Sequence, residues 1–172
     1  MAGDTRERIL TAVRDLLAHG GPSEVTLEAV ASRAGISKGG LLYHFPSKAA
    51  LYLGLLERVR DTVAAEMADR AARGDAARAY LDYAAPESED EAEFFTSLIA
   101  AVRTGEDADP QALALLADSF RAWEAPMRAA VADPVRAETI RLVGIGLYLG
   151  ATAGLPQPEP ELLAAVFERL LA

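Results

Sequence analysis

The chain contains no cysteine, which excludes a disulfide, a thiolate zinc site and a cysteine nucleophile. It has only two histidines, and neither a Ser/His/Asp set nor an HExxH motif occurs, so we expect no enzyme. The longest apolar run, residues 142–155, contains glycines and is shorter than the ~20 residues that a membrane span needs. We therefore expect a cytoplasmic protein with no membrane partner, no cofactor and no metal.

Positive charge is also scarce, and it is unevenly distributed. The formal net charge is −9; residues 1–50 carry six basic and five acidic side chains, whereas residues 51–172 carry eleven and twenty-one. Lys38 and Lys48, which lie ten residues apart, are the only lysines. An acidic segment repels nucleic acid, so any contact with DNA must be local to the first fifty residues. This asymmetry predicts two parts with different partners.

Alanine and leucine dominate what is present, and β-branched runs are scarce, which favours helix throughout. Asp4 and Glu7 have the spacing of a capping box, Gly105 should end a helix, and Pro126 should kink or break one. Capping signals predict further helix starts at Thr26, Ser37, Ser47, Ser88, Asp109 and Asp133. With short loops and no credible strand, these signals predict an all-α bundle of about nine helices.

Two short predicted helices, residues 27–34 and 37–44, are joined by the tetrapeptide AGIS and have the anatomy of a helix-turn-helix. Gly35 permits the left-handed backbone that a tight turn often needs. Leu41 and Phe45 should fill the small core beneath the second helix. The residues left exposed on that helix would be Ser37, Lys38, Gly39, Gly40, Tyr43 and His44. This set is basic, hydroxylated and sterically thin, as a DNA-binding surface should be.

The chemistry of these residues fits a duplex. Lys38 can reach a phosphate or a guanine edge from the start of its helix. Gly39 and Gly40 let the backbone approach DNA, although each costs the helix roughly 0.5–1 kcal/mol relative to alanine. The side chains able to donate to phosphate oxygens are those of Thr26, Tyr43, His44 and Lys48. On this pattern alone, a helix-turn-helix in a bundle that does not bind DNA remains an alternative.

The stretch TLEAVASRAGISKGGLLYHFPSK, residues 26–48, resembles the DNA-binding motif of the tetracycline-repressor (TetR) family of bacterial regulators. The resemblance covers about residues 5–55, with the Ser-Lys-Gly, Tyr-His-Phe and Ser-Lys elements in register. It implies a homodimer whose two recognition helices enter successive major grooves of a pseudo-palindromic operator. By the family pattern the main contacts would be Lys38, Tyr43 and Lys48, and the secondary ones Thr26, Ser37, Gly39 and His44. Gly40 departs from the pattern, since a polar residue often stands there, so DNA shape should contribute to specificity.

Beyond about residue 55 the resemblance is architectural only. It implies that residues 1–48 form the DNA-binding domain and that residues 49–172 form a helical ligand-binding and dimerisation domain. The most favoured function is then a repressor released by a small ligand. Aromatic and large apolar residues of the middle helices suggest an apolar or aromatic ligand. The candidates are Tyr80, Phe94, Phe95, Phe120, Trp123 and Met127, and for any single one of them an ordinary core position is the favoured explanation.

We expect the dimer interface on the last two long helices. Gly146, Gly150 and Gly154 recur every four residues, which leaves one helix edge bare for close packing of another backbone. The terminal helix offers a broad apolar face that includes Leu163, Val166, Phe167 and Leu170. A single chain could bury this face itself, but pairing across a two-fold axis is the favoured arrangement.

Two other functions stay open at this point. One keeps DNA binding without a small ligand, as an activator or as a regulator controlled by a protein partner. The other is a structural or protein-binding helical module. We expect Arg6 to be a solvated helix-start charge and His19 to be a helix-end residue without a partner. The acidic residues Glu87, Glu89, Asp90, Glu91 and Glu93 should form a solvated loop and a negative helix start rather than a cation site.

Overall fold

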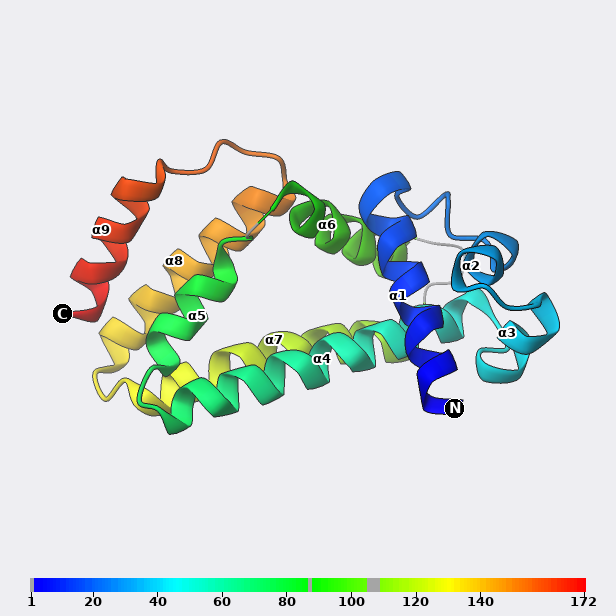
Figure 1. Cartoon of the computed structure of the whole chain (residues 1–172). Helices are drawn as coiled ribbons and strands as arrows, with labels where there is room; N and C mark the ends of the chain where they lie inside the picture. Colours follow the sequence, from blue (N-terminus) through cyan, green and yellow to red (C-terminus); the bar gives the residue numbers. More distant parts are fainter. Residues whose placement is uncertain (1, 87, 105–108) are drawn as a thin grey trace. The chain divides into compact units, whose positions relative to one another are not determined.

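The computed structural model describes residues 2–86, 88–104 and 109–172, and these ranges contain nine helices and no strand (Figure 1). The helices are α1 (Ala2–Gly20), α2 (Leu27–Ala34), α3 (Lys38–His44), α4 (Lys48–Ala72), α5 (Ala76–Ala84), α6 (Glu89–Thr104), α7 (Pro110–Ala130), α8 (Pro134–Thr152) and α9 (Pro160–Leu171). The all-α fold predicted from composition and capping signals is confirmed. None of the helices in these ranges has the length and apolar character to cross a bilayer.

The helices group into two compact units, and neither is a continuous stretch of chain. The first comprises Met1–Val59 and Ser88–Ala117, and the second Arg60–Glu87 and Asp118–Ala172. Helices α4 and α7 therefore each contribute to both units. This grouping differs from a contiguous division at residue 48, because α6 packs against α1 and joins the N-terminal helices.

The helix-turn-helix forms through the local signals that the sequence carries. The Thr26 hydroxyl accepts the N–H of Ala29 at 3.1 Å, and the Ser37 hydroxyl accepts the N–H of Gly40 at 3.1 Å, so both predicted N-caps are confirmed. Gly35 ends α2 with a φ of +66°, in the left-handed region that favours glycine. These three residues fix where α2 ends and where α3 begins.

A single apolar core holds the first unit together. Leu41 and Phe45 are buried beneath α3, as predicted. They belong to a cluster to which α1, α2, α4 and α6 all contribute, including Ile9, Leu10, Val13, Leu17, Val30, Leu51, Leu55, Phe94 and Leu98. Helix α3 thus stands on a core that extends well beyond the helix-turn-helix itself.

The second unit is organised around the fully buried Tyr80 of α5, a helix that lies against α8 and α9 (Figure 1). The Tyr80 ring stacks on Trp123 with ring centroids 4.4 Å apart, and the Trp123 indole N–H donates to the Tyr80 carbonyl at 3.1 Å. The Tyr80 hydroxyl donates to the carbonyl of Arg141 at 3.0 Å. Gly144 leaves room for this ring, since a Cβ there would lie 2.4 Å from a Tyr80 ring carbon.

Ion pairs within α8 and between α7 and α8 support the same unit. The guanidinium groups of Arg141 and Arg128 both bond to Glu138, at 2.6 Å and 2.9 Å. Hydrogen bonds from Arg141 and then Arg128 lower the pKa of Glu138 to about 2. The carboxylate of Glu138 therefore stays charged well below its ordinary titration range.

Several local predictions need correction. Helix α1 already includes Ala2, so Asp4 lies within the first turn rather than at the cap. Helix α7 continues through Pro126 without the break that was one of the two predicted outcomes, because the buried Trp123 and Met127 anchor it on either side. The predicted helix end at Gly105 and the acidic residue Glu87 lie outside the described residues.

Candidate functional site

The outer face of α3 carries the candidate DNA contacts. Tyr43 is 85% exposed, and its ring meets the edge of the His44 ring with centroids 5.3 Å apart. Ser37, Lys38 and Gly39 are exposed, whereas His44 is half-buried. A large aromatic side chain this exposed contributes little to folding, so it is available for a contact outside the chain.

Glycine at position 39 has no folding reason that the structure reveals. A Cβ added at Gly39 would meet nothing within 4 Å, and one at Gly40 would meet only the Ser37 hydroxyl at 3.3 Å. Neither residue has a positive φ. The absence of a side chain at Gly39 therefore serves something other than packing within the described residues.

Lys38 is not a free cation in the structure. Its ammonium donates to the carboxylate of Glu28, on α2, at 2.5 Å, and both side chains are largely exposed. The hydrogen bond from Lys38 lowers the pKa of Glu28. The pair joins the two helices of the helix-turn-helix on their solvent side, and the sequence reasoning did not anticipate it.

Lys48, at the first position of α4, is also engaged within the chain. Its ammonium donates to the carbonyl of Pro22 at 3.1 Å and lies 5.6 Å from the centre of the Tyr52 ring. Lys48 thereby ties the start of α4 to the connection between α1 and α2. An ammonium has three N–H donors, so at least one of them remains for another acceptor.

Two residues expected to be unpaired have partners. Arg6 donates to Glu57 at 3.1 Å and lies over the Phe45 ring at 5.2 Å, so it fastens α1 to α4 rather than being simply solvated. The Nδ1 atom of His19 is 2.8 Å from the carbonyl of Asp15, and its Nε2 is 3.8 Å from the carboxylate of Asp90. Asp90 belongs to the acidic first turn of α6, which agrees with the negative helix start predicted there.

The predicted ligand residues fall into different units. Phe94 and Phe95, on α6, contribute to the core of the first unit, where Arg14 lies over the Phe94 ring. In the second unit Tyr80, Trp123 and Met127 are buried and Phe120 is partly buried. Sequence reasoning overlooked Tyr148, whose ring lies 5.5 Å from Phe120 and 5.7 Å from Trp123. Tyr148 lies four residues after Gly144, so the two share the buried face of α8, and this spacing could have suggested Tyr148 from the sequence.

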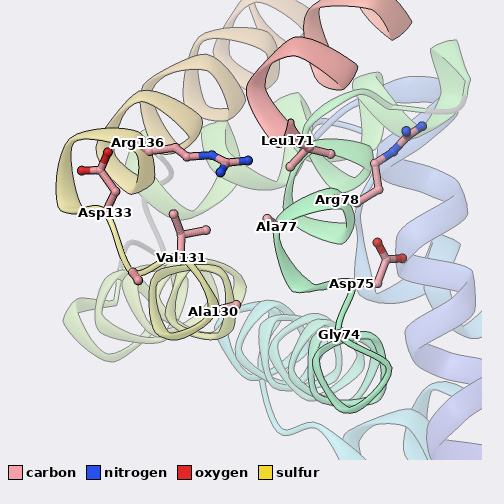
Figure 2. Close-up of a pocket in the computed structure, with 10 residues that line it drawn as sticks. Gly74, Asp75, Ala77, Arg78, Ala130, Val131, Asp133, Arg136 and Leu171 are labelled. Atoms are coloured by element: carbon pink, nitrogen blue, oxygen red, sulfur yellow. The ribbon is translucent and has the colours of Figure 1, made fainter.

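The second unit also has a pocket of about 490 Å³ that includes none of these aromatic residues (Figure 2). Its walls come from the turn after α4, the start of α5, the connection from α7 to α8 and the end of α9. The lining includes Asp75, Ala77, Arg78, Val131, Asp133, Arg136 and Leu171. These residues gave no recognisable motif, because they come together only through the folding of four separate segments.

Exposed apolar side chains follow one face of α8 at seven-residue intervals. Val135 is 73% exposed, Leu142 58% and Leu149 54%. Gly146 and Gly154 have open space beside them, while a Cβ on Gly150 would meet the Gln157 amide at 3.2 Å. The heptad spacing could have been found from the sequence.

The apolar side chains of α9 differ in exposure. Leu162 is 61% exposed and Val166 37%, whereas Leu163 and Leu170 are half-buried. Phe167 is buried, with Arg78 lying 5.6 Å from the centre of its ring. Phe167 thus belongs to the interior of its own unit rather than to its surface, because α9 turns this ring toward α5.

Comparison with known proteins gives the family. Residues 9–55 match the model of bacterial regulatory proteins of the tetR family, and residues 74–172 match that of the tetracyclin repressor-like C-terminal domain. The chain is 43% identical over 56 residues to the HTH-type transcriptional regulator RutR of Escherichia coli (strain K12), a match that covers 33% of this chain and 26% of RutR. The chain thus spans about a quarter to a third of the length of the curated relatives it matches.

Solved structures share the fold over almost the whole chain. A transcriptional regulator from Rhodococcus sp. Rha1 superposes with a TM-score of 0.73 at 23% identity, covering 96% of this chain and 93% of that one. The multidrug binding protein EbrR, complexed with ethidium, superposes with a TM-score of 0.69 at 22% identity, covering 96% and 98%. At these identities the likeness shows a common fold. With a family model covering each end of it, the chain belongs to the tetR family of bacterial regulatory proteins.

Proposed function

We propose that this regulator is a repressor that binds a pseudo-palindromic operator as a homodimer and leaves it when a small ligand binds. The observation that carries the proposal is the outer face of α3, where an exposed tyrosine and a glycine without packing neighbours stand beside a lysine. In this proposal residues 1–48 act as the DNA-binding domain, and residues 49–172 act in ligand binding and dimerisation.

The proposed DNA contacts follow from position and chemistry. Lys38 exchanges Glu28 for a phosphate or a guanine edge, while Tyr43 donates its hydroxyl to a phosphate. Lys48 offers a phosphate an N–H that Pro22 does not use. The supporting contacts that we propose are Thr26, Ser37, Gly39, Gly40 and His44. Since Lys48 also holds the α1–α2 connection, we expect its replacement to lower stability as well as affinity.

The apolar face of α8 supports a homodimer. Val135, Leu142 and Leu149 on α8 are exposed apolar side chains on one helix face, and Leu162 and Val166 are exposed on α9; exposed apolar side chains grouped on a surface are typical of an interaction site. A two-fold axis would let the same face on a second copy cover it. We propose that Gly146, Gly150, Gly154, Leu163 and Leu170 adjoin this interface.

Charge on that face should prevent dimerisation. Leu142→Glu with Leu149→Glu should sediment as a monomer, since burying two unpaired carboxylates in an apolar interface is costly. Leu113→Glu is a matched control, because Leu113 is 43% exposed on α7 in the first unit. If the double variant sediments like the wild-type chain and the control, this face is not the interface.

A small apolar or aromatic ligand remains part of the proposal. The ring cluster of Tyr80, Phe120, Trp123 and Tyr148 offers aromatic surface, and EbrR, which shares the fold, has been crystallised with ethidium. The close contacts among these rings favour a second candidate. It is an activator, or a regulator under the control of a protein partner, that uses no small ligand and keeps these rings as core.

Selection of bound fragments from the source genome tests DNA reading directly. We expect a shared inverted repeat whose half-sites lie one helical turn apart, about 34–36 Å. Lys38→Ala should weaken binding to that repeat and reduce its salt slope by about 0.9 log unit for one lost phosphate contact. If a folded dimer enriches no repeat even after unfolding, washing and refolding to remove any bound ligand, the proposal of operator binding is wrong.

A further inference from the structure

The pocket of the second unit contains an arginine whose binding capacity is only partly used. Arg136, near the start of α8, donates its Nε to the carbonyl of Leu170 at 2.9 Å. The two terminal nitrogens of Arg136 form no hydrogen bond or ion pair with any residue that the structure describes. Figure 2 shows the side chain extending from α8 across the pocket toward Leu171.

The other charged groups of the lining are already engaged. Arg78 bonds to Asp82 at 2.7 Å and to Glu168 at 3.5 Å, and in Figure 2 its guanidinium is turned away from Arg136. Asp133 accepts the N–H of Val135 at 2.9 Å as the cap of α8. Asp75 is paired with Arg70 at 2.5 Å. Arg136 is therefore the cation of the pocket that has no carboxylate partner among the described residues.

The remaining lining is apolar and small, which leaves space beside the Arg136 guanidinium. Ala77, Val131 and Leu171 supply this surface. A volume of about 490 Å³ lies within the usual range for small-molecule sites, ~300–1,000 Å³. An apolar wall beside a guanidinium suits a molecule with an apolar body and a single acidic group.

We propose that this pocket binds a small amphipathic carboxylate, held by the terminal nitrogens of Arg136 with its apolar body against Ala77, Val131 and Leu171. A guanidinium presents parallel donors that match the two oxygens of a carboxylate. A cationic ligand would be repelled by the guanidinium of Arg136. A doubly charged phosphate would be repelled by the carboxylates of Asp75 and Asp133, which also line the pocket. A monoanion is the charge that this lining tolerates best.

The pocket is joined to the helices of the proposed dimer face. Arg136 lies between Val135 on α8 and the last turn of α9, so a bound carboxylate would hold these two helix ends together. Any effect of the carboxylate on operator affinity rests on the proposed function, whereas its binding to the pocket does not.

Calorimetric titration of the full chain without DNA tests the site. The probes are 1-naphthylacetate and octanoate, with 1-naphthylacetamide as the uncharged match of the first. We expect saturable binding of one naphthylacetate or octanoate per chain, with the amide weaker by about tenfold or more, as the loss of a charged hydrogen bond implies. Binding of neither carboxylate at millimolar concentration, or equal binding of naphthylacetate and its amide, would overturn the proposal.

Arginine variants locate the binding. Arg136→Gln should weaken binding of naphthylacetate by about tenfold or more. Arg169→Gln should not, because Arg169 is an exposed arginine on α9 whose side chain forms no hydrogen bond or ion pair with the described residues. Equal affinity in both variants would place the ligand elsewhere and refute the site.

A second variant guards against a folding defect. Ala77→Leu narrows the pocket and leaves the arginine at position 136 unchanged. It should also weaken the binding of naphthylacetate while the thermal transition stays cooperative, and unchanged affinity would refute the site. Operator binding is measured separately. A chain that binds naphthylacetate through Arg136 but enriches no DNA repeat would support the pocket and refute the proposed function alone.

Discussion

Replacing Gly39 by alanine should stabilise the protein and weaken operator binding at the same time. Gly39 lies in the seven-residue helix α3, has no positive φ, and would place a Cβ in open space. The new methyl group therefore meets no steric opposition within the described part of the chain. Alanine also restricts the unfolded chain more than glycine does, which favours the folded state.

The size of each effect can be estimated. Alanine is favoured over glycine inside a helix by roughly 0.5–1 kcal/mol, which corresponds to a rise in Tm of about 1–4 °C for a chain of this length. If the Gly39 backbone lies close to a phosphate, the methyl group displaces α3 and removes at least one charged hydrogen bond. The loss of one such bond lowers affinity by about tenfold or more.

Urea unfolding and operator titration, at one protein concentration and one salt concentration, provide the test. A variant that binds DNA weakly because it is unfolded would have a lower urea midpoint, whereas Gly39→Ala should have a higher one. Unchanged operator affinity in a stabilised variant would refute the close approach of Gly39 to DNA. A lower midpoint would refute the open space seen beside Gly39.

Three further substitutions should change DNA binding or stability in defined directions. Glu28→Gln releases Lys38 and removes a negative charge near the proposed phosphate contact. It should therefore tighten non-specific DNA binding and lower the ratio of operator affinity to non-specific affinity. Glu24 is an exposed acid without that pairing, so Glu24→Gln should change this ratio less in the same titrations. Gly144→Ala should lower stability in urea by about 1–3 kcal/mol, because its Cβ would overlap the Tyr80 ring; a stabilised variant would contradict the packing. Glu138→Gln should lower the urea midpoint at pH 7, because a carboxylate whose pKa is lowered in the folded state stabilises the protein while it is ionised. The difference between the variant and the wild-type chain should fade as the pH falls from 4.5, the ordinary pKa of the group, toward its folded-state pKa of about 2. A difference that persists at pH 2 would argue against the ion pairs.

Local signals made the helices of the first unit predictable. Thr26 and Ser37 are caps whose hydroxyl groups reach an N–H three residues later, and Gly35 has the backbone conformation that glycine adopts most readily. Such features depend on neighbours within a few residues, so the sequence contains them in full. The prediction that α3 turns a polar face outward rested on the same kind of local sequence signal.

Long-range partners could not be predicted in the same way. Lys48 bonds to a carbonyl 26 residues earlier, and Arg136 bonds to one 34 residues later. A backbone carbonyl has no sequence signature, because every residue has one. The aromatic residues show the same limit. Phe94 resembles Tyr80 in the sequence, but α6 packs against α1 and places Phe94 in the first unit.

The outer face of α3 combines features that folding alone would not select. Gly39 weakens its helix, Tyr43 leaves a ring in water, and the ammonium of Lys38 is held by an exposed carboxylate whose contribution to stability is small. Each of these features is explained if the face binds a polyanion such as DNA. In the proposed complex, Gly39 would let the backbone approach DNA, Tyr43 would donate to a phosphate, and a phosphate would have to displace Glu28 from Lys38. We then expect random DNA to gain less from Lys38 than a site that offers this lysine a second acceptor. We therefore expect the pairing of Lys38 with Glu28 to favour discrimination among DNA sequences over tight binding to DNA.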